Sequence, residues 1–108
     1  MNEKNRKEIE RINKLLLPVF MNSRARKAYL FGSFSKGTQT RKSDLDLMII
    51  TDTDKRFFDR YDDYEKIQQI LADRSVDMLI YTSEEISNIS HRVFIKKILE
   101  EGEIIYEC

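Results

Sequence analysis

Three aspartates stand at positions where their type and spacing could support metal chemistry. Asp44 and Asp46 lie at the start of the run 45–51, whose alternation predicts a strand. Side chains two residues apart in a strand share a face and lie about 7 Å apart. Asp77 is the one acid in the apolar run 76–80, where a charge without a partner is costly. Carboxylates gathered from two strands predict a site for Mg²⁺, which takes hard oxygen ligands.

A glycine–serine step upstream could hold the anion on which such a metal site acts. Gly32 and Ser33 follow the apolar run 28–31, and two of the chain's three glycines fall within residues 32–37. Glycine lets the backbone approach a bound anion, while the Ser33 hydroxyl and the Lys36 ammonium could contact phosphate oxygens. The residues therefore predict triphosphate on one side of a cleft and metal on the other, which suits in-line attack on phosphorus.

Each of these interpretations has a plain structural alternative. Asp44 and Asp46 could form a solvated strand edge, and Asp77 could pair with a buried arginine or lysine. The basic residues after the glycine–serine step could equally form a solvated turn (Lys36, Arg41 and Lys42). The combination of three acids with Gly32 and Ser33 favours catalysis over a set of unrelated charges.

The first half of the chain predicts two helices. Residues 3–17 and 55–72 carry apolar side chains at helical spacing. Pro18 is expected to end or bend the first helix, because its ring disfavours helical backbone before it. The second helix is expected to take its N-cap from Asp52, Thr53 or Asp54.

The second half predicts two shorter helices, and the sheet is expected to draw strands from both halves. Thr82-Ser83-Glu84-Glu85 matches a capping box that begins a short helix. Ser90 is expected to cap a last helix that ends at Gly102. Strands alternating with helices predict an α/β or α+β sheet with helices packed on it. The predicted strands are 28–31, 45–51, 75–81 and 104–106.

Length and composition narrow the classes of protein that this chain could belong to. Its 108 residues suit one domain, 1–108. Lys+Arg and Asp+Glu are both 19, so the basic surplus of a non-specific nucleic-acid binder is lacking. The single cysteine, Cys108, can form no intrachain disulfide. The charged start and the short apolar runs predict neither signal peptide nor membrane span, and hence a cytoplasmic protein.

The pattern Gly32-Ser33, ten intervening residues, then Asp44-Leu45-Asp46 resembles the G-S-x10-D-x-D motif of the DNA polymerase β-type nucleotidyltransferases. More narrowly, the chain resembles the small prokaryotic minimal nucleotidyltransferases (MNT domain). The similarity continues through the strand with Asp77, the Thr-Ser-Glu-Glu helix start and the closing run 101–106. This resemblance implies an α+β fold, in which a small mixed β-sheet with helices packed on it forms a polymerase β-type palm.

The resemblance also implies roles for the site residues. Asp44 and Asp46 would bind two Mg²⁺ ions, while Asp77 would bind the catalytic ion and help deprotonate the acceptor hydroxyl. Gly32 and Ser33 would hold the nucleotide triphosphate. Many relatives carry arginines within the glycine–serine turn, where this chain has Phe34 and Lys36, and Lys36 keeps one cation there.

A partner protein is implied in the same way. Proteins of this kind commonly accompany a helical HEPN protein in a toxin–antitoxin pair, and the nucleotidyltransferase is the antitoxin that transfers AMP from ATP to the toxin. Two alternatives remain open: a stoichiometric antitoxin with little catalysis, and transfer to a small-molecule acceptor. Exposed members of the apolar set could contact a partner or a second copy in a homodimer (Phe57, Phe58, Tyr61, Tyr64, Val93, Phe94 and Ile98).

Overall fold

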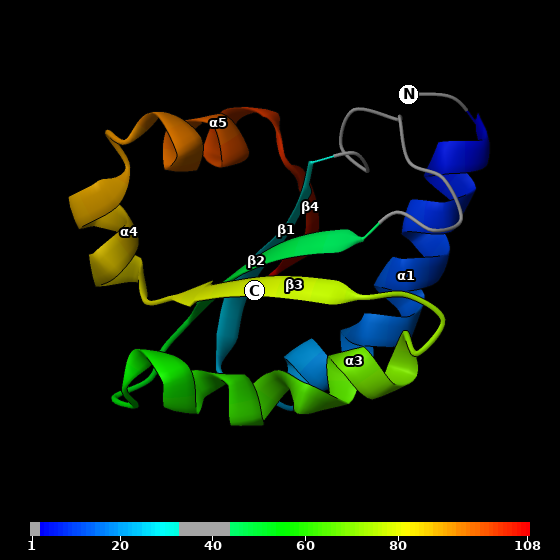
Figure 1. Ribbon diagram of the computed structural model, residues 1–108, viewed down its shortest axis with the longest axis horizontal. Helices are drawn as coiled ribbons and strands as arrows, with labels where there is room; N and C mark the ends of the chain where they lie inside the picture. Colours follow the sequence, from blue (N-terminus) through cyan, green and yellow to red (C-terminus); the bar gives the residue numbers. More distant parts are fainter. Residues whose placement is uncertain (1–2, 33–43) are drawn as a thin grey trace.

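The computed structural model describes residues 3–32 and 44–108 as one four-stranded sheet with helices on both faces (Figure 1). The fold is α+β, which confirms the class predicted from the sequence. In chain order the elements are α1 (Glu3–Met21), β1 (Ala25–Phe31), β2 (Leu45–Thr51), the 3₁₀ helix η1 (Phe57–Tyr64), α3 (Glu65–Ile70), β3 (Val76–Tyr81), α4 (Ser83–Ile89), α5 (Val93–Glu101) and β4 (Glu103–Glu107).

The sheet is mixed, and its directions decide which residues meet. Its strand order is β3-β2-β1-β4. β1 runs antiparallel to both β2 and β4, whereas β2 and β3 run parallel. The end of β1 therefore lies beside the starts of β2 and β3. This geometry places Gly32, which follows β1, at the same end of the sheet as Asp46 and Asp77.

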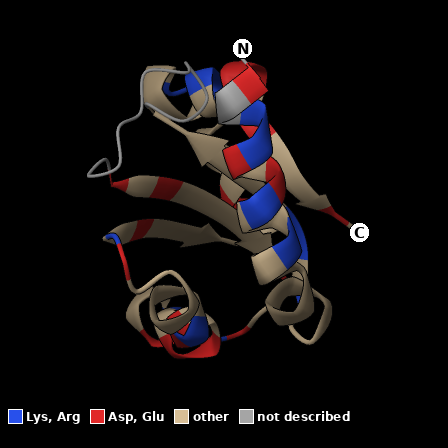
Figure 2. Cartoon of the chain, turned by 90° about the vertical axis from the view of Figure 1, so that its right-hand side faces the viewer, with Lys and Arg blue, Asp and Glu red and all other residues tan. Residues whose placement is uncertain are grey.

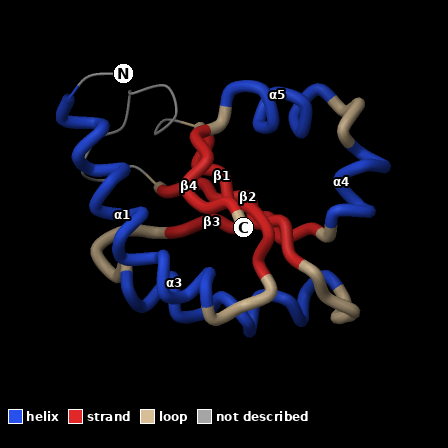
Figure 3. The backbone as a smooth tube through the Cα atoms, turned by 180° about the vertical axis from the view of Figure 1, so that it is seen from behind, coloured by secondary structure: helices blue, strands red, loops and turns tan. Residues whose placement is uncertain are grey.

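The two faces of the sheet bury two separate groups of side chains. Leu45, Leu47 and Ile49 of β2 pack in the cluster that includes the apolar residues of α1 and α3. Met48 and Ile50 pack in the other cluster, with side chains from α4 and α5. Figure 3 shows these helix pairs on opposite sides of the strands. The predicted alternation of β2 is confirmed, and Asp46 shares a face with Met48 because they are two residues apart.

The sequence predicts that Pro18 ends or bends the first helix, and the structure shows that α1 does not end there. The helix continues for another turn to Met21, with Pro18 inside it. Beyond it, the Asn22 backbone N–H and side-chain amide both donate to the Pro18 carbonyl, at 3.1 and 2.8 Å. Phe20 in this turn is fully buried. Burial of an aromatic ring and satisfaction of the last carbonyls offset the lost proline N–H donor.

The predicted helix 55–72 is η1 followed by α3, and its predicted cap is wrong. The N-cap is Arg56, with no side-chain hydrogen bond. Thr53 instead accepts a bond from the Lys55 N–H at 3.1 Å in a local turn, as short polar side chains often do. Tertiary bonds hold η1 in place: the Tyr61 hydroxyl donates to the Met78 carbonyl at 2.6 Å, and the Tyr64 hydroxyl bonds Thr51 Oγ1 at 2.8 Å.

Of the two predicted caps in the second half, one is confirmed and one is wrong. Thr82 and Glu85 form both bonds of the capping box that begins α4. Ser90 does not cap α5; it follows α4, where its hydroxyl donates to the Ser87 carbonyl at 3.3 Å. The N-cap of α5 is Arg92, without a side-chain bond. α5 ends at Glu101, directly before Gly102, as the sequence predicts.

Candidate active site

Asp46 and Asp77 lie side by side at one end of the sheet. They are directly paired in the register of the parallel strands β2 and β3. Asp46 precedes Met48 by two residues, and Asp77 precedes Leu79 by two. Met48 and Leu79 both pack in the cluster formed with α4 and α5, so both carboxylates project from that face of the sheet. Figure 2 shows acidic positions together at the starts of these two strands. The two carboxylates therefore converge as the sequence predicted.

Asp46 is held in an electrostatically unfavourable place. It is partly buried, and burial is the first cause that raises its pKa. The carboxylates of Asp77 and Asp44 raise the pKa of Asp46 further. Among residues 3–32 and 44–108, no ion pair includes any of these three acids. A carboxylate that is desolvated beside like charges favours the binding of a cation.

Asp77 is exposed, which differs from the burial expected of an acid in an apolar run. β3 is an edge strand, and α4 and α5 cover this face around Met48, Ile50 and the later part of β3. The desolvation cost anticipated from the sequence is thereby avoided. The alternative that Asp77 pairs with a core arginine or lysine has no support within the described part of the chain.

Gly32 lies directly against the Asp46 carboxylate. Its φ is +72°, a left-handed conformation that side chains with a Cβ rarely adopt. A Cβ built on Gly32 would stand 2.5 Å from Asp46 Oδ2. The Gly32 backbone is therefore close to a carboxylate of the site itself, and its approach to a bound phosphate stays a prediction.

The three acids have the donor chemistry that magnesium requires, since carboxylate oxygens are its preferred protein ligands. As they are arranged, however, the described residues contain no group of three His, Cys, Asp or Glu side chains that could hold a metal ion. Asp44 is exposed and precedes β2, while Asp46 and Asp77 are paired within the sheet. Metal binding by Asp44, Asp46 and Asp77 thus stays a prediction.

Comparison with known proteins bears on this site. A family model described as "Polymerase beta, Nucleotidyltransferase" matches residues 10–108, a span that contains all three aspartates and Gly32. The chain belongs to this family. It is a nucleotidyltransferase, and the superfamily resemblance drawn from the glycine–serine and Asp-x-Asp motifs is confirmed.

Particular relatives of this nucleotidyltransferase agree with the family match. A protein of Methanocaldococcus jannaschii named as a putative protein adenylyltransferase is 36% identical over 84 residues, which cover 77% of this chain and 80% of that protein. A chain of a toxin–antitoxin crystal structure with AMP-PNP has a similar fold, with a TM-score of 0.66, 21% identity, and coverage of 89% of this chain and 73% of that one.

A second solved structure shares the fold. It is the complex of a tri-AMPylated Shewanella oneidensis HEPN toxin with its MNT antitoxin, at a TM-score of 0.56 and 20% identity. The match covers 96% of this nucleotidyltransferase and 73% of that chain. At these identities the likeness concerns the fold, and it supports the polymerase β-type arrangement of sheet and helices.

Two predicted phosphate contacts fall outside the described residues. Ser33 and Lys36 belong to the stretch 33–43, as do Phe34, Arg41 and Lys42. Their roles toward a nucleotide stay predictions. Gly32, at the border of this stretch, is the predicted phosphate-side residue whose geometry the structure describes.

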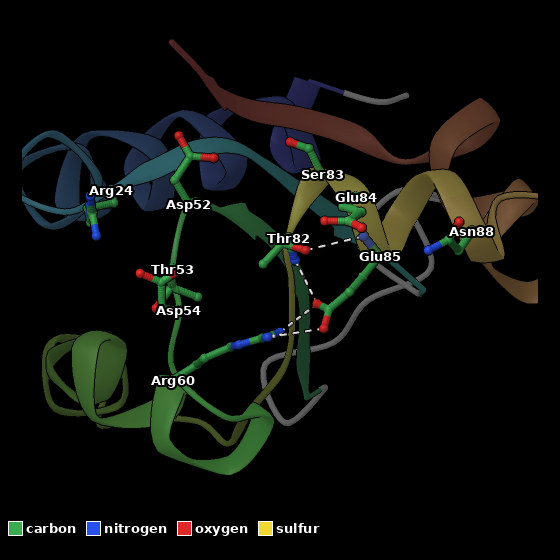
Figure 4. A pocket seen from close by; sticks show the side chains of 10 residues that line it. All are labelled: Arg24, Asp52, Thr53, Asp54, Arg60, Thr82, Ser83, Glu84, Glu85 and Asn88. Carbon is green, nitrogen blue, oxygen red and sulfur yellow. Dashed lines mark hydrogen bonds and ion pairs between the residues drawn. The ribbon is translucent and has the colours of Figure 1, made fainter.

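The nucleotidyltransferase has a polar cavity of about 590 Å³ at the opposite end of the sheet (Figure 4). It lies where β2 and β3 end and β1 begins, and Arg24, Asp52 and Thr82 are among its lining residues. It is not the site of the paired aspartates.

Within the described ranges, no helix is long and apolar enough to cross a membrane.

Arg60 and Glu85 form an ion pair in this cavity that the sequence did not reveal. Two parallel bonds of 2.6 and 3.0 Å join them, and Figure 4 shows the guanidinium directed at the carboxylate. Arg60 also donates to the Lys55 and Ile80 carbonyls, at 3.0 and 3.2 Å. The hydrogen bond from Arg60 is the main cause that lowers the pKa of Glu85. The pair joins η1, β3 and α4.

Proposed function

We propose that this nucleotidyltransferase transfers AMP from ATP to a hydroxyl group of a partner protein, in a reaction that depends on Mg²⁺. The observation that carries the proposal is the in-register pair Asp46 and Asp77 beside Gly32. Two neighbouring carboxylates beside Gly32 repel each other and do not stabilise the fold. They do fit a site that positions a metal-bound nucleotide for in-line attack.

The proposed roles of the site residues follow the family motif. Asp44, Asp46 and Asp77 hold magnesium, and Gly32, Ser33 and Lys36 hold the triphosphate. Bound magnesium supplies positive charge that stabilises the transferring phosphoryl group. These assignments extend the geometry of the described residues with the family motif.

We assign to Asp77 the role of receiving the acceptor's proton. It is exposed and on an edge strand, so a hydroxyl group can reach it from solvent without passing over the sheet. In the proposed reaction the hydroxyl oxygen attacks the α-phosphorus, and its proton passes to the Asp77 carboxylate. The bond from the α-phosphorus to its bridging oxygen breaks, and pyrophosphate leaves.

The proposed partner is a helical protein of the HEPN class, with this chain as the antitoxin of the pair. Support comes from the M. jannaschii relative's name, which specifies a protein as the acceptor. It comes also from the shared fold with the antitoxin that accompanies an AMPylated HEPN toxin in Shewanella oneidensis. We place both proteins in the cytoplasm, in keeping with an unpaired terminal cysteine.

Transfer of label from α-phosphate-labelled ATP to a purified HEPN-class candidate partner tests the proposal. We expect transfer by the wild type with Mg²⁺, its loss on chelation, and its return when Mg²⁺ is restored. Asp77→Asn should reduce the rate by roughly 10³-fold, the scale of removing a group that stabilises the transition state. Asp62→Asn, which changes another exposed aspartate on η1, is the matched control and should transfer at the wild-type rate.

The same experiment separates the alternatives. If Asp77→Asn neutralises the partner as fully as the wild type does, the chain acts as a stoichiometric antitoxin. If label appears on an added aminoglycoside and not on the protein, the acceptor is a small molecule. Either result would contradict transfer to a protein as the working activity.

A further inference from the structure

Phe94 is an exposed aromatic residue at the start of α5. Its side chain is 57% exposed, and its neighbour Val93 is 84% exposed. One edge of Phe94 is supported, because its ring meets that of Phe31 at 5.8 Å in an edge-on arrangement of 86°. Single exposed apolar residues are common on protein surfaces. The position of this one relative to the carboxylates makes it informative.

The row of side chains across the sheet fixes that position. Phe31 is paired with Asp46 in the β1–β2 register, and Asp46 is paired with Asp77 in the β2–β3 register. Phe31 packs in the same cluster as Met48 and Leu79, so all three members of the row point to one face. The order along this face is therefore Phe94 on Phe31, then Asp46, then Asp77.

This order puts the aromatic pair on the nucleotide side of the site. Phe31 directly precedes Gly32, the residue proposed to face the triphosphate, whereas Asp77 lies on the other side of Asp46, where the acceptor is proposed to enter. Adjacent strands are about 4.8 Å apart. If the α-phosphate lies over Asp46, the ring one strand away is that of Phe31, and the exposed ring of Phe94 is centred 5.8 Å from it. A base joined to that phosphate through its ribose could therefore reach the aromatic pair from the Asp46 side.

We propose that Phe94, supported by Phe31, is the surface on which the base of the bound nucleotide stacks. The inference rests on the proposed function, since it assumes a nucleotide over Asp46. A flat base on an aromatic ring is stabilised by about 1–3 kcal/mol as measured by alanine substitution. Every base has such a flat face, so Phe94 contributes affinity for nucleosides in general, and the choice between adenine and guanine has to come from other groups.

Binding of two ligands distinguishes this role. Dissociation constants are measured by calorimetry for Mg-ATP and for Mg-tripolyphosphate, which lacks both base and ribose. Phe94→Ala should weaken Mg-ATP binding by roughly 5- to 150-fold, the range that corresponds to stacking of one base, and should leave Mg-tripolyphosphate binding unchanged. Phe94→Trp, which keeps a flat ring, should bind Mg-ATP at least as tightly as the wild type.

Phe58→Ala is the matched control. Phe58 is 83% exposed and meets Phe57 edge-on at 5.5 Å and 81°, but it lies on η1, away from α5. Its substitution should change neither affinity. Circular dichroism and thermal midpoints of both alanine variants check that each is folded.

The outcomes that overturn the inference are distinct. Equal weakening of ATP and tripolyphosphate would mean that Phe94 shapes the site without touching the base. Unchanged ATP affinity with a raised KM for the partner protein would assign Phe94 to the partner. Absence of ATP binding by the wild type would remove the proposed function itself, and the stacking role with it.

Discussion

The two ends of the sheet treat acidic side chains in opposite ways. At one end the Glu85 carboxylate receives two bonds from Arg60, and its pKa is lowered. At the other, Asp46 stands beside two further carboxylates, and its pKa is raised. Arg60 is only 7% exposed, so its charge is satisfied within the fold. The difference indicates that Glu85 serves the structure, and it agrees with the proposed role of Asp46 in holding a metal-bound nucleotide.

A substitution at Asp46 should have the greatest effect on activity. Asp46→Asn keeps the size of the side chain but removes the charge, and transfer of label should fall by at least 10³-fold, about 4 kcal/mol in activation free energy. Stability should behave differently. Since burial and the neighbouring carboxylates disfavour the ionised form, the variant should be as stable as the wild type at neutral pH, or slightly more so.

The pH dependence of that difference follows from the direction of the pKa shift. A carboxyl group whose pKa is raised by folding contributes stability while it is protonated, and this contribution is lost as the pH rises through its folded pKa. The free energy of unfolding, measured with urea, should therefore favour Asp46→Asn over the wild type by more at pH 7 than at pH 3. A variant clearly less stable than the wild type at pH 7 would show that favourable contacts hold the Asp46 carboxylate.

The next largest effect is expected from a substitution of Arg60, at the opposite end of the sheet. Arg60→Met removes the donor to the Lys55 and Ile80 carbonyls and to Glu85, and should lower the free energy of unfolding by about 2–4 kcal/mol. Urea unfolding measures this loss. The folded fraction should still transfer AMP at the normal rate, because the pair lies far from Asp46. Loss of activity in folded protein would show that the two ends are coupled.

Arg26→Met is the control for this variant. Arg26 pairs with Asp52 near the same end of the sheet, but the two side chains are 60% and 46% exposed. Solvent and salt screen an exposed pair, so Arg26→Met should unfold at nearly the same urea concentration as the wild type. A loss at Arg26 as large as that at Arg60 would mean that burial is not the source of the difference.

A smaller effect is expected from a substitution of Gly32, which lies against the Asp46 carboxylate. Gly32→Ala introduces a Cβ at positive φ, which costs about 1–2 kcal/mol, and the new atom would meet Asp46 Oδ2 at 2.5 Å. Transfer should fall because the carboxylate is displaced. Repeating the substitution in an Asp46→Ala background should reduce its cost in stability, as a double-mutant cycle measures. Additive costs would show that the glycine is needed for its backbone angle alone.

The smallest expected effect tests the cap that positions Glu85. Thr82 accepts a bond from the Glu85 N–H at 3.2 Å, and the Glu85 carboxylate accepts one from the Thr82 N–H at 2.8 Å. Thr82→Ala should destabilise the protein by about 1 kcal/mol, and Thr82→Ser by much less, because the hydroxyl is the group that caps. Thermal unfolding compares the two. An equal loss in both variants would assign the effect to the threonine methyl group.

Local patterns predicted part of this arrangement well. The β2 strand was predicted with its observed bounds, 45–51, because alternating apolar residues with two buried faces leave few other structures. The Thr82 capping box was predicted because its bonds join residues three apart. The continuation of α1 past Pro18 was not, since it depends on where the ring of Phe20 is buried. The prediction that Ser90 caps the last helix was wrong for a related reason. Serine is a suitable capping residue, but α5 begins two residues later, after Arg92.

Three features can be read from the sequence alone: the set of acids, the alternating faces of β2 and the glycine that follows β1. Each depends on neighbours only a few residues away. Three further features depend on the folded chain: Asp77 is in register with Asp46, Asp77 is exposed on an edge strand, and Arg60 is bonded to Glu85. Strand order, register and pairs separated by 25 residues are set by packing of the whole chain. The motif specifies which groups take part, and the sheet specifies which of them meet.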